Sequence, residues 1–290
     1  MKLALGGAQF GLAYGVANKG GQVALQEVSK ILRVAYDQGI RAIDTAIAYG
    51  DSEAALGQVG VSGWRVVTKL PEMPVDICGA DEVRRWVSQQ VQGSLQRMQV
   101  DCLHGLLLHR PQQLLAEQGH HLYRALLAMK EKRWVNKIGV SIYQPDELPA
   151  LFANMSFDLV QAPLSIIDQR LVQSGWAERL HSKGVDLHVR SAFLQGLLVM
   201  PDDQRPAKFA IWNDIWTVWR DWLRGAGVPP LDACLRYVYQ VPAVTNVVVG
   251  VDSMQHLEEI LKVPETCLPS LPNWGEIDER LLNPARWSKL

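Results

Sequence analysis

The sequence is poor in cysteine and has no long apolar run. Its four cysteines, in 290 residues, form no close pair of the Cys-x-x-Cys type, and glycines interrupt the first apolar stretch too early for a secretory signal. We therefore expect reduced thiols and a cytoplasmic protein. No segment reaches the roughly 18 consecutive apolar residues of a membrane span, so no membrane partner is expected.

Neither sign of charge dominates. The chain has 29 lysines and arginines against 30 aspartates and glutamates, which gives no electrostatic reason to expect a nucleic-acid partner. An apolar content of 48% is too high for a disordered chain. Since no linker, charge block or low-complexity tract divides the chain, we expect a single domain over residues 1–290, with a proline-rich C-terminal extension from about residue 264.

Short β-rich apolar runs alternate with longer amphipathic stretches along the whole chain. The amphipathic stretches predict helices, one ending at Gly39, one capped by Asp81 and one covering Leu171–Lys183. Eight strand–helix units in about 250 residues predict an α/β fold, a closed (β/α)8 TIM barrel, and a doubly wound open sheet is the main alternative. The expected strands are Leu3–Ala8, Ala42–Thr45, Arg65–Lys69, Leu103–His109, Lys137–Val140, Leu159–Gln161, Asp186–Ser191 and Asn246–Gly250.

Four polar side chains lie at or just after consecutive strand ends. Asp44, Lys69 and His109 end the second, third and fourth expected strands, and Tyr49 follows Asp44 by five residues. In a barrel, the carboxyl ends of the strands share one face, and active sites lie there. These four residues are therefore the candidate catalytic set.

The chemistry of this set favours proton transfer to an oxygen. A phenol has an ordinary pKa of about 10, and an ammonium about 4 Å away stabilises the phenolate by up to ~4 kcal/mol, so Lys69 is expected to lower the pKa of Tyr49. Asp44 would hold the ammonium, and His109 would donate a hydrogen bond to a substrate oxygen. The chain has no hydride donor of its own, so a carbonyl reduction requires a nicotinamide cofactor.

The same residues lie in motifs that resemble the aldo-keto reductase superfamily over nearly the whole chain. The run from Val189 to Gly196 resembles a bacterial branch that we associate with sugar and surface-polysaccharide metabolism. The resemblance implies a barrel that binds extended NADP(H) without a Gly-x-Gly-x-x-Gly fingerprint, and that reduces an aldehyde or ketone with Tyr49 as proton donor. The motifs are Asp44-Thr45-Ala46-x-x-Tyr49-Gly50-x-Ser52-Glu53, Thr68-Lys69, Leu107-Leu108-His109, Lys137-Ile138-Gly139-Val140-Ser141 and Val160-Gln161.

The resemblance also implies which residues bind the cofactor and the substrate. Ser141 and Gln161 would hold the nicotinamide carboxamide, Arg190 would stack on its ring, and the start of the last helix would take the adenosine end. No metal is expected, because no cluster has metal-ligand spacing. The implied cofactor set is Gly7, Asp44, Ser141, Gln161, Arg190, Ser191, Phe193, Gln195, Gly196, Gly250, Val251, Asp252, Ser253, His256 and Glu259. The expected substrate pocket contains Phe10, Tyr49, His109 and Trp212, with Trp212 at the rim because it lies next to residues 200–209.

Asp252 stands where many members of the family carry Arg or Lys beside the 2′-phosphate. A carboxylate repels a phosphate and often pairs with a free ribose diol. NADP(H) is therefore the expected cofactor, with NAD(H) as the alternative. Two other functions stay open, a nicotinamide-binding sensor or partner subunit with slow turnover and a redox-neutral sugar dehydratase or epimerase. The sequence identifies neither the carbonyl substrate nor the oligomeric state, and residues 200–209 are expected to form a mobile loop over the site.

Overall fold

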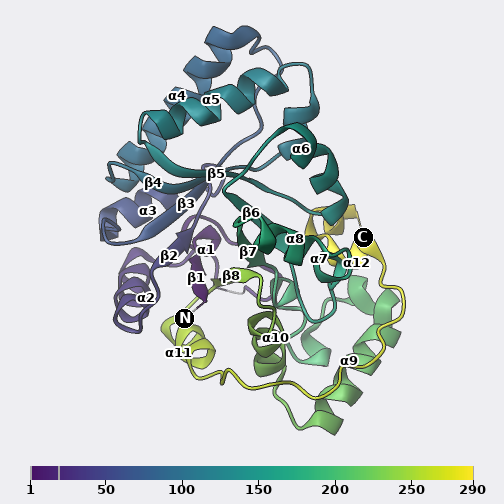
Figure 1. Cartoon of the computed structure of the whole chain (residues 1–290). Helices are drawn as coiled ribbons and strands as arrows, with labels where there is room; N and C mark the ends of the chain where they lie inside the picture. Colours follow the sequence, from purple (N-terminus) through teal and green to yellow (C-terminus); the bar gives the residue numbers. More distant parts are fainter. Residues whose placement is uncertain (1, 19, 290) are drawn as a thin grey trace.

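The computed structural model describes residues 2–18 and 20–289 and forms a closed barrel of eight parallel strands. Each strand pairs with the next in the sequence, and β8 closes against β1 (Figure 1). The predicted (β/α)8 barrel is confirmed, and the open-sheet alternative is wrong because the described strands pair in a closed ring. The strands are β1 (Leu3–Gly6), β2 (Ala42–Asp44), β3 (Arg65–Leu70), β4 (Leu103–Leu108), β5 (Val135–Ser141), β6 (Leu159–Pro163), β7 (Asp186–Arg190) and β8 (Val244–Gly250).

Helices follow the strands around the outside of the barrel (Figure 1). They are α1 (Ala8–Gly11), α2 (Leu25–Asp37), α3 (Ser52–Val59), α4 (Gly79–Met98), α5 (Gly119–Glu131), α6 (Leu148–Asn154), α7 (Arg170–Gln173), α8 (Trp176–Ser182), α9 (Asn213–Ala226), α10 (Pro230–Tyr239), α11 (Met254–Leu261) and α12 (Glu279–Leu282). Short 3₁₀ turns cover Pro111–Leu115, Pro145–Glu147, Leu194–Gly196, Asp202–Gln204, Ala207–Trp212 and Pro284–Lys289.

Two of the expected helix boundaries are wrong. Helix α4 begins at Gly79, directly after Cys78, so Asp81 lies in the first turn and does not cap the helix. The segment predicted as one helix over Leu171–Lys183 is two short helices, because Gly175 takes a left-handed φ of 74° between them. Neither difference alters the barrel, since both lie on its outer layer.

The parallel register brings the predicted functional residues to one end of the barrel. Asp44 is the last residue of β2, Lys69 is the penultimate residue of β3, and His109 directly follows β4. Ser141, the last residue of β5, pairs in register with Gln161 of β6. These side chains therefore meet at the carboxyl ends of five neighbouring strands.

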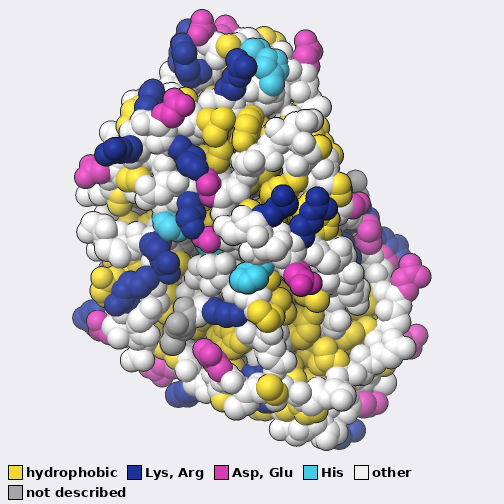
Figure 2. Space-filling view, viewed as in Figure 1, with side chains coloured by type: hydrophobic (Ala, Val, Ile, Leu, Met, Phe, Trp, Pro, Cys, Tyr) yellow, Lys and Arg dark blue, Asp and Glu magenta, His cyan; other side chains and the backbone are white. Residues whose placement is uncertain are grey.

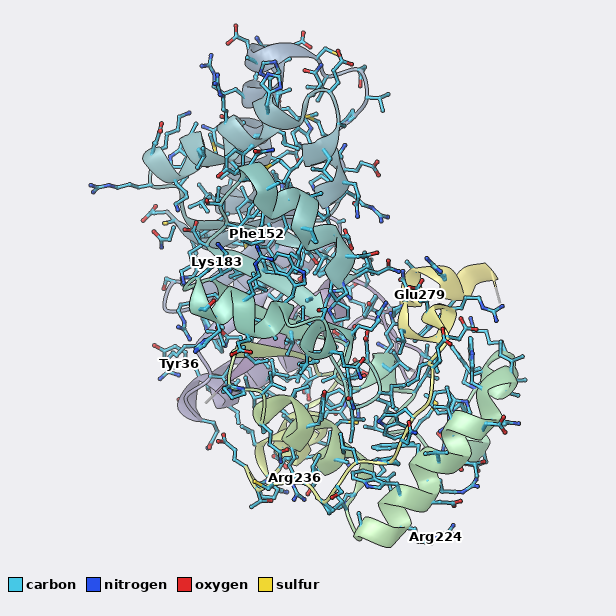
Figure 3. All side chains as sticks on the ribbon, turned by 45° about the vertical axis from the view of Figure 1, so that its right-hand side comes forward. Tyr36, Phe152, Lys183, Arg224, Arg236 and Glu279 are labelled. Carbon is cyan, nitrogen blue, oxygen red and sulfur yellow. The ribbon has the colours of Figure 1, made fainter. Side chains whose placement is uncertain are left out.

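A second apolar core lies beside the barrel, between α9 and the C-terminal tail (Figures 1 and 3). Trp216 and Trp219 on α9 are each 3% exposed and belong to this core, as the tryptophan spacing suggests for a helix that packs on one side. The indole of Trp222 donates to the Ser270 carbonyl at 2.9 Å, and Arg236 on α10 donates to the Thr266 carbonyl at 2.9 Å. These contacts hold the tail against α9 and α10.

Charged side chains of both signs are interspersed on the face shown in Figure 2. None of the helices formed by residues 2–18 and 20–289 is long and apolar enough to cross a membrane. Over the same residues, no group of three or more His, Cys, Asp or Glu side chains has the arrangement of a metal site.

Candidate active site

A buried ion pair forms the base of the site. Lys69 Nζ lies 2.6 Å from Asp44 Oδ2 and also donates to the Thr45 carbonyl at 2.9 Å. The side chains of Lys69 and Asp44 are 1% and 6% exposed. Burial lowers the pKa of Lys69, and the Asp44 carboxylate opposes this effect. The pair thus places two compensating charges inside the barrel mouth.

A hydrogen-bonded chain continues from this pair through the barrel interior. Gln161 Nε2 donates to Asp44 Oδ1 at 2.6 Å, and Ser141 Oγ donates to Gln161 Oε1 at 3.3 Å. Both side chains are buried, with Gln161 at 0% and Ser141 at 1% exposure. The two residues that the resemblance assigns to the nicotinamide carboxamide therefore satisfy each other and Asp44 in this structure.

The backbone around Tyr49 is held by close packing on α1. A Cβ atom at Gly11 would lie 1.9 Å from the Tyr49 carbonyl oxygen, so only glycine fits there. Ser52, which is fully buried, donates from its hydroxyl to the Gly7 carbonyl at 2.7 Å and from its backbone N–H to the Tyr49 carbonyl at 3.1 Å. The turn that carries Tyr49 is therefore fixed to the loop after β1.

Tyr49, Lys69 and His109 lie together. Lys69 Nζ is 5.1 Å from the centre of the Tyr49 ring. The Tyr49 and His109 rings have centroids 5.8 Å apart and meet edge to face, at 78°. The structure thus brings all four predicted catalytic residues, including Asp44, into one cluster.

Burial sets the protonation of the two ring side chains. It lowers the pKa of His109 to about 4, with the Lys69 charge acting in the same direction, so the imidazole is neutral near pH 7. Burial also raises the pKa of Tyr49, and the Asp44 carboxylate raises it further. The expectation that Lys69 lowers the pKa of Tyr49 is therefore wrong, because Asp44 offsets the ammonium at 2.6 Å and burial opposes the phenolate.

A cavity of about 480 Å³ extends from this cluster along the strand ends. Twelve of the predicted residues lie on its wall, namely Gly7, Asp44, Tyr49, Arg190, Ser191, Phe193, Gln195, Gly196, Gly250, Asp252, His256 and Glu259. The wall does not include eight others, Phe10, Lys69, His109, Ser141, Gln161, Trp212, Val251 and Ser253. The cavity therefore joins the Tyr49 cluster to the loops that follow β7 and β8.

Two of the predicted pocket residues are placed elsewhere by packing. Phe10 is fully buried in the main core, so its ring does not reach the pocket. Trp212 is 7% exposed and packs in the second core, where its indole donates to Asp278 Oδ2 at 3.3 Å. The prediction that Trp212 lies at the pocket rim is wrong because the C-terminal tail covers it.

The two ends of the segment 200–209, which was expected to form a mobile loop, have different surroundings. Met200 lines the cavity, and Phe209 is fully buried.

The loop after β7 bends sharply over the cavity. Ser191, Leu194 and Gln195 all have positive φ, at 65°, 47° and 52°, a conformation that residues other than glycine rarely adopt. The Gln195 amide donates to the Tyr14 hydroxyl at 3.0 Å, across the cavity from the β1 side. Such clustered backbone strain is typical of ligand-binding segments.

The far end of the cavity is acidic. Asp252 and Glu259 line it, and Arg190 and His256 are the basic side chains that the described part of its wall contains. The backbone N–H of Met254, at the start of α11, already donates to the Glu27 carboxylate at 2.9 Å. One N–H group at the start of α11, the helix expected to take the adenosine end, is thus bonded to a carboxylate of this chain.

Three contributing residues were missed in the sequence. Gly11 is the last residue of α1, Tyr14 lies in the loop after this helix, and Tyr143 follows β5. Tyr14 lines the cavity, and the Tyr143 ring lies 4.5 Å beneath the Arg190 guanidinium. The glycine cluster at positions 6, 7 and 11 was the available signal for close backbone approach. The two tyrosines fall outside any motif, so the sequence alone gave no indication of them.

Comparison with known proteins identifies the family. The model of the aldo/keto reductase family matches residues 2–279. The chain belongs to this family. Its members generally bind nicotinamide cofactors and reduce carbonyl compounds.

Solved structures of other proteins have the same fold as this chain. An aldo-keto reductase from Bacillus halodurans, in its holo form, superposes with a TM-score of 0.72 at 18% identity over 93% of this chain and 88% of that one. A Pseudomonas aeruginosa protein assigned to the aldo-keto reductases gives 0.65 at 23% identity, over 90% and 88%.

Proposed function

We propose that this aldo-keto reductase reduces an aldehyde or ketone to an alcohol with NAD(P)H, and that Tyr49 donates the proton. One observation carries the proposal. A protonated phenol on the wall of a cavity of about 480 Å³ lies beside a neutral imidazole and a compensated Lys69–Asp44 pair.

Each member of the cluster has a defined task. A bound dihydronicotinamide would supply the hydride that the chain lacks. Tyr49 Oη gives its proton to the carbonyl oxygen as negative charge develops there. The neutral His109 donates a hydrogen bond to the same oxygen and orients it. Lys69 and Asp44 keep the floor of the site polar but uncharged overall, so the phenol retains its proton until the carbonyl is reduced.

The residues on the cavity wall fit a dinucleotide. They run from Tyr49 through the bent loop at Ser191–Gly196 to Asp252. The buried Gln161 donates to Asp44 and accepts from Ser141. Among the residues that the structure describes, the Asp252 end offers carboxylates and no Lys or Arg. This distribution favours a free ribose diol over a 2′-phosphate, so we infer that NADH is accepted at least as well as NADPH.

The function is tested by a spectrophotometric screen of aldehydes, ketones and sugar aldehydes with both reduced cofactors. The wild-type protein should oxidise the cofactor, and Tyr49→Phe should bind the cofactor normally while losing most turnover. Turnover by Tyr49→Phe near the wild-type rate would falsify the role of the phenol. Product formation without any net change in cofactor absorbance would instead indicate the redox-neutral dehydratase or epimerase.

A further inference from the structure

Arg190, the last residue of β7, is a cation on the cavity wall. None of the ion pairs found among residues 2–18 and 20–289 includes it. The acidic residues of the same wall are Asp44, which is bonded to Lys69 and Gln161, and Asp252 and Glu259 at the far end. Arg190 is half-buried, so its charge is only partly solvated.

The Arg190 guanidinium is held in place but keeps free donors. Nη2 donates to the Ile142 carbonyl at 3.0 Å, and Nη1 donates weakly to Ser191 Oγ at 3.4 Å. One face lies 4.5 Å from the centre of the Tyr143 ring, a cation–π contact. A guanidinium has five N–H donors, so three of them have no acceptor within the part of the chain that the structure describes.

A fixed, half-buried guanidinium with spare donors is suited to a bidentate anion. Its charge acts on the reactive end of the cavity, since Arg190 opposes the rise in the pKa of Tyr49 and contributes to the lowered pKa of His109. Arg190 and Tyr49 line the same cavity, so an anion bound by Arg190 lies in the cavity that holds the reacting oxygen. Because the Tyr143 ring contacts only the face of the Arg190 guanidinium, the N–H donors at the guanidinium edge stay available.

We propose that Arg190 binds a carboxylate or phosphate group of the carbonyl substrate, so that the preferred substrates are anionic aldehydes or ketones. This assignment rests on the proposed carbonyl reduction. The anionic group supplies the acceptors that Arg190 lacks, and it fixes the substrate relative to Tyr49.

The test compares two aldehydes of equal chain length, butanal and 4-oxobutanoate, which differ in a terminal methyl or carboxylate. The readout is the ratio of kcat/KM for the acid to that for the neutral aldehyde at saturating cofactor, because this ratio cancels any general loss of activity. Arg190→Gln should lower the ratio by about 10- to 100-fold, and Arg190→Lys by less, since it keeps the charge but loses the fork. Arg110→Gln is the matched control, because this arginine is exposed and outside the cavity wall, although its charge also acts on His109.

Two further measurements separate the possible outcomes. The NADH dissociation constant, from fluorescence titration, shows whether Arg190 instead contacts the cofactor phosphates. A ratio unchanged in both Arg190 variants overturns the proposal, whether or not NADH binding weakens.

A second experiment measures the binding of succinate by calorimetry, with and without NADH, and does not depend on enzyme turnover. If no carbonyl compound of the screen is reduced, the proposed function fails, and Arg190 is still supported by at least tenfold weaker succinate binding in Arg190→Gln than in Arg110→Gln. Equal binding in these two variants overturns it, and thermal unfolding verifies that each variant is folded.

Discussion

Gly11→Ala is expected to disable the site although Gly11 carries no reactive group. The glycine lies in α1, and a Cβ atom there would be 1.9 Å from the Tyr49 carbonyl oxygen and 2.4 Å from the Ser52 nitrogen. Both contacts are with backbone, so no side-chain rotation relieves them. The turn that carries Tyr49 must move away from α1.

The size of this displacement follows from the structure. Cβ atoms essentially never approach closer than 3.0 Å, so the Tyr49 carbonyl must move by at least about 1.1 Å relative to α1. A misplacement of about 1 Å in a catalytic group can reduce the rate by roughly 100-fold. Cofactor binding should weaken much less, because the clash at Gly11 is with the turn that carries Tyr49 and Ser52, and no atom of the 191–196 loop or of Asp252 is among its nearest contacts.

The measurements are kcat with an aldehyde that the wild type reduces, the NADH dissociation constant and the thermal midpoint. Gly225→Ala is the matched control, because a Cβ atom at Gly225 in α9 meets nothing within 4 Å. That variant should retain wild-type kcat and gain up to about 1 kcal/mol of stability from helix propensity. A Gly11→Ala protein with kcat within threefold of the control would refute the reasoning.

Three other predictions follow from the same contacts. Asp252→Asn should tighten NADPH binding by roughly tenfold and leave NADH binding nearly unchanged, because one negative charge is removed from the 2′-phosphate end; parallel fluorescence titrations check this, and equal changes for both cofactors would contradict it. Glu53→Gln should lower the free energy of unfolding by about 3 kcal/mol in urea titrations, since the buried carboxylate is paired with Arg97 at 2.7 Å; an unchanged midpoint would argue against it. Burial lowers the pKa of His188 to about 4, so between pH 6.5 and 4.5 the unfolded chain binds a proton that the folded chain does not, and stability falls by about 2 kcal/mol as the pH falls. His188→Gln should show a shallower decline in urea titrations at the two pH values, and parallel slopes would exclude the effect.

The barrel was predictable because its signals repeat. Each strand is short and rich in buried Val, Ile and Leu, and each is followed by an amphipathic stretch. The predicted helix boundaries were wrong where the local backbone conformation determined them. The expected helix over 171–183 breaks at Gly175, and α4 starts two residues before Asp81. Such boundaries depend on one or two dihedral angles, which apolar periodicity does not report.

The candidate catalytic cluster was predictable because a (β/α)8 barrel fixes where strand ends lie, whatever the conformation of the loops. The pocket wall was not, because loops and the C-terminal tail determine it. The spacing of Trp212 from the other tryptophans of its stretch is typical of a core residue, whereas its position after residues 200–209 is typical of a pocket rim. Only the packing of the C-terminal residues near Asp278 shows that Trp212 lies in the second core. The contact between the Glu27 carboxylate and the Met254 N–H at the start of α11 joins residues 227 positions apart in the sequence. No local sequence pattern indicates such a contact.

The direction of the pKa shift of Tyr49 could also be determined only from the structure. An ammonium near a phenol stabilises the phenolate only while its charge is uncompensated, and the Asp44 carboxylate lies 2.6 Å from Lys69. Once the pair is neutral, desolvation of the phenol decides, and Tyr49 keeps its proton. A phenol that is hard to ionise is a poor base for alcohol oxidation. It still donates to an alkoxide, because the pKa of an alkoxide's parent alcohol is higher than that of a phenol. The same burial that contradicts the expected pKa shift therefore keeps Tyr49 in the form that can donate a proton.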